Sequence, residues 1–145
     1  MFLNYERDAM DDGELVARFA NATLQHLPHD DHVRLVWLYA REGGAEYAVK
    51  RIREGLIAYT AARGSSAHFH ETRTWAWAVL IADATLASSA ATFTDFLAEH
   101  PRFLRRDLLS GYYSEALLAS DEARATIVQP DLATLLSPGR PSPAP

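Results

Sequence analysis

The chain has 145 residues, an apolar fraction of 48% and a formal net charge of −5, which predict one globular domain with a core of its own. It contains no basic run, so the positively charged surface that nucleic acid or an anionic membrane requires is not expected. Cysteine is absent, which excludes disulfides, thiolate zinc sites and cysteine nucleophiles, so any metal would have nitrogen and oxygen ligands.

The hydrophobic pattern has a helical period and no alternation typical of strands, so the expected fold class is all-α, with five to seven helices. In chain order, the four main helices are predicted from about 12 to 27, from 30 to the Gly43-Gly44 pair, from 45 to 63 and from 70 to 87. Thr92 and Asp95 are spaced like a capping box, and short helices are expected after Arg102, Ser114 and Ser120. The helical domain is expected over 1–136, followed by a disordered, proline-rich tail at 137–145.

The N-terminal sequence MFLNYERDAMDDGE lacks the basic and apolar regions of a signal peptide, and a cytoplasmic location is therefore expected. The longest apolar run, WAWAVLIADATLA, is shorter than the ~20 residues that span a bilayer. It is interpreted as a buried core helix, and no membrane partner is expected.

Histidines gather at the predicted starts of two helices. In HDDHVRLVWLYAR, His29 and His32 are spaced i and i+3 on the apolar side of the helix, with Tyr39 further along the same line. In HFHET, His70 and Glu71 border the apolar side of the helix that follows. Polar groups are costly in a core unless something satisfies them, so a shared site between the two helix starts is predicted.

The leading interpretation of this site is a metal centre with His29, His32, His70 and Glu71 as ligands, holding iron, zinc or copper. Glu71 would be a ligand or a base, and Asp31 would orient a histidine from outside the ligand set. His68 lies before the helix and is at most a spare ligand. Three further residues are candidates for substrate contact because they continue the same helix faces: Tyr39, Thr74 and Trp77.

The same stretches resemble a group of small, largely uncharacterised bacterial helical proteins with the pattern H-x-D-H-x-x-x-A-W-x-Y, followed about forty residues later by Y-H-E-T-x-T. Val36 replaces the usual alanine and Phe69 the usual tyrosine, and the resemblance covers most of residues 15 to 136. It implies a family-level site at these residues: His29, Asp31, His32, His70, Glu71 and Thr74.

Three classes of function remain open from the sequence. The first is a small metal-dependent enzyme, or a metal-binding protein, acting on a small molecule. The second is a metal-free protein that binds a small organic ligand, or performs acid–base chemistry, with the same histidines and Glu71. The third is a structural or partner-binding helical domain in which the histidines only hydrogen-bond their neighbours.

Overall fold

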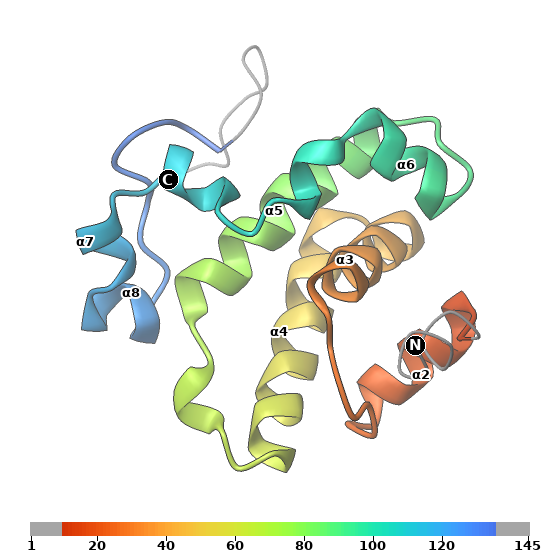
Figure 1. Cartoon of the computed structure of the whole chain (residues 1–145), viewed down its shortest axis with the longest axis horizontal. Helices are drawn as coiled ribbons and strands as arrows, with labels where there is room; N and C mark the ends of the chain where they lie inside the picture. Colours follow the sequence, from red (N-terminus) through yellow and green to blue (C-terminus); the bar gives the residue numbers. More distant parts are fainter. Residues whose placement is uncertain (1–9, 136–145) are drawn as a thin grey trace.

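The computed structural model describes residues 10–135, and all regular structure in this range is helical (Figure 1). The predicted single all-α domain is therefore confirmed. The helices are α2 (Asp12–Ala20), α3 (His29–Gly43), α4 (Ala45–Ala62), α5 (Glu71–Ala87), α6 (Phe93–Glu99), α7 (Glu115–Leu118) and α8 (Asp121–Ala125). Three 3₁₀ turns connect them: η1 (Ser66–His68), η2 (Pro101–Leu104) and η3 (Leu108–Gly111). The predicted tail at 137–145 lies outside the described residues.

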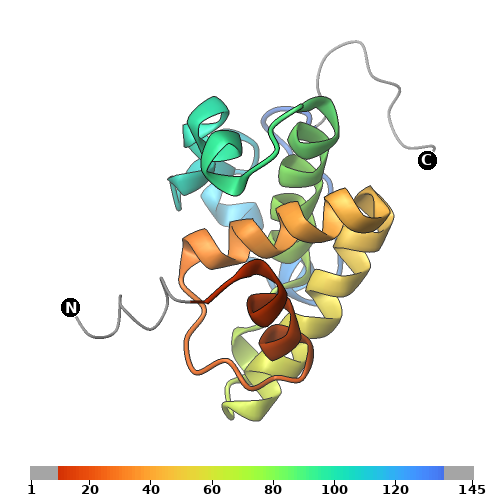
Figure 2. The ribbon, with the colours of Figure 1, turned by 90° about the vertical axis from the view of Figure 1, so that its right-hand side faces the viewer.

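The centre of the molecule is formed by α3, α4 and α5, which pack on one another (Figures 1 and 2). Their inward faces bury Trp37, Ile52 and Ile81 almost completely. The helix α5 is apolar on nearly every side because α3, α4 and the C-terminal segments all cover it. No helix among residues 10–135 is both long enough and apolar enough to cross a membrane.

Local signals set most of the helix boundaries. Asp11 and Thr92 cap α2 and α6, each accepting a hydrogen bond from the backbone N–H three residues later. Gly44 and Gly64 follow α3 and α4 with positive φ angles of 91° and 68°, a conformation that glycine adopts without a steric penalty. These boundaries agree with the predicted ones to within one or two residues.

The first predicted helix is too long. It was expected to reach residue 27, whereas α2 ends at Ala20. Asn21 then turns the chain, because its side-chain Oδ1 accepts hydrogen bonds from both the N–H and the hydroxyl of Thr23. Leu24 is nevertheless buried, from an irregular segment rather than from a helix face. The spacing of the apolar residues in 21–27 agrees with a helical period although this segment is not helical, which explains why the predicted helix was too long.

The chain from 112 to 135, here called the C-terminal arm, contains α7 and α8 and lies against α5 (Figure 1). The arm closes on itself through bonds from the Tyr113 hydroxyl to the Val128 carbonyl at 2.8 Å, from the Leu132 N–H to the Tyr112 carbonyl at 2.9 Å and from the Ser114 N–H to the Asp131 carboxylate at 2.7 Å. Tyr113 is buried, and burial raises its pKa to about 12. The arm is thus a small packed unit attached to one side of the central helices.

Candidate functional site

The first turn of α3 brings His29 and His32 together, with ring centroids 6.2 Å apart. His29 donates from Nε2 to the Phe103 carbonyl at 2.7 Å, and the His29 and Trp77 rings pack edge to face with their centroids 4.8 Å apart. The Nε2 atom of His32 is shielded from solvent and has no hydrogen-bond partner among residues 10–135. Burial, followed by the neighbouring His29, lowers the pKa of His32 to about 4. His32 is therefore a neutral imidazole at physiological pH.

His70 is the N-cap of α5, and both of its ring nitrogens are hydrogen-bonded. Nδ1 accepts from the Arg73 N–H at 3.0 Å, and Nε2–H donates to the Leu118 carbonyl of the arm at 2.8 Å. This arrangement requires the neutral tautomer with its proton on Nε2. Burial correspondingly lowers the pKa of His70. The imidazole has no lone pair left for a metal or a substrate in this state.

Glu71 begins α5 and faces α4 rather than the histidines. Its carboxylate accepts from Nε and Nη2 of Arg53 at 2.8 and 2.9 Å, a bidentate ion pair. The Glu71 side chain is 18% exposed and that of Arg53 is 48% exposed. The pair therefore lies at the surface.

The four residues predicted as one metal centre are thus divided among three environments. His29 and His32 adjoin each other, His70 is used by the arm and Glu71 is held by Arg53. Residues 10–135 contain no group of three or more His, Asp or Glu that could hold a metal ion. The ligand set expected from the sequence does not fit a metal in this arrangement.

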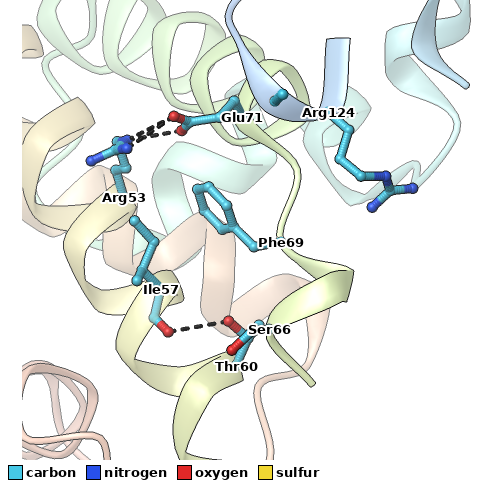
Figure 3. Close-up of a pocket in the computed structure, with 8 residues that line it drawn as sticks. Arg53, Ile57, Thr60, Ser66, Phe69, Glu71 and Arg124 are labelled. Atoms are coloured by element: carbon cyan, nitrogen blue, oxygen red, sulfur yellow. Dashed lines mark hydrogen bonds and ion pairs between the residues drawn. The ribbon is translucent and has the colours of Figure 1, made fainter. Parts of the chain in front are cut away.

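Glu71 and Arg53 instead border a surface pocket of about 340 Å³ (Figure 3). The pocket is lined from three directions, by α4, by the η1–α5 junction and by α8. The lining residues are Arg53, Ile57, Thr60, Ser66, Phe69, Glu71, Arg124 and Ala125. Figure 3 shows the Phe69 ring between the ion pair at one end and the hydroxyl-bearing Thr60 and Ser66 at the other, with the guanidinium of Arg124 directed away from the pair.

The remaining predicted residues have other surroundings. Asp31 and Thr74 are buried, and the Thr74 N–H bonds the His70 carbonyl within the helix start. Tyr39 packs in the core against Phe19 and Tyr47, and burial raises its pKa. Trp77 contacts His29 as described above, and the exposed His68 ends η1. None of these residues lines the pocket at Glu71.

Sequence reasoning missed Arg53, Thr72 and Arg124. Arg53 lies on the polar face of an amphipathic helix, and nothing in the sequence distinguishes it from an arginine that is simply exposed to solvent. Thr72 stands inside the quoted HFHET stretch but was given no role. Only the position of residues distant in the chain shows that these three side chains matter.

Comparison of the chain with protein-family models, with curated proteins and with solved structures found no match.

Proposed function

We propose that this protein is a metal-free binding protein for a small organic anion, with the pocket at Arg53 and Glu71 as its binding site. The single observation that carries the proposal is the pocket itself, whose 340 Å³ lies in the range typical of small-molecule sites. It places the apolar ring of Phe69 between polar groups at its two ends, and such a mixture of apolar surface with a few polar groups is usual for these sites.

The arginine in the pocket retains hydrogen-bonding capacity. A guanidinium has N–H donors on Nε, Nη1 and Nη2, and Glu71 occupies only Nε and one side of Nη2. The Nη1 group of Arg53 makes no hydrogen bond within residues 10–135 and remains available to a ligand carboxylate or phosphate. Arg53 is thus held in place by Glu71 and can still bind a second anion.

The unused hydrogen-bond donors and the shape of the pocket favour an anion with an apolar body. The formal charges of Arg53 and Glu71 cancel and the guanidinium of Arg124 is directed away from this pair, so the unused N–H groups of Arg53 supply the attraction for an anion. Phe69 and Ile57 offer apolar surface beside the ion pair, suited to an aryl or branched alkyl group. An aromatic or aliphatic carboxylate satisfies both requirements, and this small-molecule ligand would be the protein's partner, in the cytoplasmic setting expected from the sequence.

Benzoate is a suitable probe, with benzamide as its uncharged isostere. We expect benzoate to bind with a Kd in the millimolar range, about −4 kcal/mol, and to shift the backbone amide resonances of Phe69 and Ile57 in an NMR titration. Arg53→Gln should abolish this binding. Glu71→Gln should tighten it several-fold, because Arg53 is released and the local positive charge rises.

Glu46→Gln is the matched control, since Glu46 is on the same helix, is exposed and lies outside the pocket lining. It removes the same unit of charge as Glu71→Gln and should leave the Kd for benzoate almost unchanged. Equal binding of benzoate and benzamide, or an Arg53→Gln variant that binds benzoate like the wild type, would refute the proposal.

A further inference from the structure

Apart from the backbone bonds to Leu109 where the arm begins, four hydrogen bonds within residues 10–135 tie the C-terminal arm to the rest of the molecule, and these four end within residues 67–72. His70 Nε2 donates to the Leu118 carbonyl at 2.8 Å, before α8. Thr72 Oγ1 donates to the Thr126 carbonyl at 2.7 Å and accepts from the Val128 N–H at 3.1 Å, after α8. The fourth bond joins the Arg124 guanidinium to the Ala67 carbonyl at 3.1 Å.

His70 and Thr72 therefore hold the chain on both sides of α8. Between them in the sequence lies Glu71, which holds Arg53 at the pocket. Between their attachment points in the arm lie Arg124 and Ala125, which form the α8 wall of the same pocket. One tripeptide at the start of α5 thus sets both the ion pair and the opposite wall.

We propose that His70 and Thr72 are positioning residues for the ligand pocket: they clamp α8 so that Arg124 and Ala125 complete it, and ligand affinity depends on this clamp. The inference rests on the proposed ligand binding at Arg53 and Glu71. Because the coupling of two events is reciprocal, a ligand lying against the α8 wall must also stabilise the arm. The arm is then a ligand-responsive wall and not only a cover for the apolar side of α5.

Thr72 is the residue to change, because its hydroxyl makes two of the four bonds and its side chain is fully buried. Thr72→Val keeps the shape and removes both bonds, whereas Thr72→Ser keeps the hydroxyl. Thr85→Val is the matched control on the same helix. Thr85 is also buried, but its hydroxyl bonds only the Ile81 carbonyl of α5 itself, at 2.7 Å.

The experiment is amide hydrogen exchange on the full chain, with and without saturating benzoate, alongside benzoate titrations of each variant. Without ligand, Thr72→Val should speed exchange in residues 115–128 by about tenfold, while Thr85→Val and Thr72→Ser leave these residues close to wild type. Benzoate should slow exchange in the same residues of the wild type. The Kd for benzoate should rise about fivefold in Thr72→Val and stay within about twofold of wild type in Thr72→Ser.

Each outcome decides one of the two proposals. If Thr72→Val and Thr85→Val exchange alike in residues 115–128, the clamp is overturned whatever benzoate does. If the arm loosens in Thr72→Val but benzoate binds as in the wild type and does not protect the arm, the positioning role is overturned. If the wild type fails to bind benzoate, the proposed function fails, while the exchange of Thr72→Val against Thr85→Val still decides whether the clamp exists.

Discussion

His70 combines two structural roles in one side chain. It caps α5 through Nδ1 and holds the arm through Nε2, so it must remain neutral for both bonds to persist. A carboxamide or hydroxyl residue could cap the helix equally well, but it could not also reach the Leu118 carbonyl, which lies 48 residues away in the sequence. A histidine at position 70 is therefore explained by the length of its side chain, which caps α5 and also contacts the Leu118 carbonyl.

Variants of His70 separate these two roles. His70→Asn should keep the cap and lose the bond to Leu118, which lowers the free energy of unfolding by about 1–2 kcal/mol. His70→Ala loses the cap as well and should be less stable by about a further 1 kcal/mol. Urea unfolding followed by circular dichroism measures both values. If His70→Asn is as unstable as His70→Ala, the cap contributes nothing to stability. If His70→Asn is as stable as the wild type, the hydrogen bond to Leu118 contributes nothing.

At the scale of elements, the packing of α2 on α4 depends on a glycine. Gly55 is buried on α4, and a Cβ atom at this position would overlap the ring of Phe19 on α2. Phe19 is itself almost fully buried, so the ring has no free space into which it could move. Glycine permits the close approach of α2 and α4, although its helix propensity is lower than that of alanine.

Gly55→Ala should therefore destabilise the protein by about 1–3 kcal/mol, although alanine is the better helix former. Gly13→Ala is the natural comparison, because Gly13 is exposed in α2 and a Cβ there meets only Asp11 Oδ1 at 3.6 Å. It should stabilise by about 0.4–1 kcal/mol. Thermal unfolding of the two variants tests the sign of each effect, and a stabilising Gly55→Ala would contradict the tight α2–α4 contact.

At the scale of the whole molecule, the buried His70 and the half-buried His32, whose Nε2 atom is shielded from solvent, connect stability to pH. The pKa of His32 is lowered to about 4 and that of His70 is also lowered, in both cases chiefly by burial. Below the unfolded-state pKa of about 6.5, the unfolded chain binds protons at these residues that the native state does not bind. Stability should thus be greatest above pH 6.5 and decrease as the pH falls from 6.5 toward 4.

The shift at His32 corresponds to about 3 kcal/mol of stability lost over this window. Urea unfolding at pH 7.5, 5.5 and 4.5 should show the decrease. His32→Leu should flatten it and raise stability at neutral pH, because the unpartnered Nε2 is removed from the core. A His32→Leu profile parallel to that of the wild type would show that His32 does not titrate as its burial requires.

The positions of the helices and of most of their ends follow from local sequence signals. Helix caps such as Asp11 and Thr92, and the glycines at 44 and 64, interact only with residues close to them in the chain. The helix ends that they set can therefore be predicted from the sequence without knowledge of the fold. The sequence also identified His70 and Glu71 as unusual polar groups at a helix start, and the structure gives both of them specific partners.

Only the tertiary structure decided what those polar groups contact. Helical periodicity gives the direction in which His70 and Glu71 leave α5, but their partners, Leu118 and Arg53, come from segments 48 and 18 residues away. The same local pattern would suit a metal ligand, a helix cap or an ion pair, because all three place a polar side chain at a helix start. Which of the three forms depends on whether the arm and α4 offer a carbonyl and a guanidinium there, and that is a property of how the helices pack.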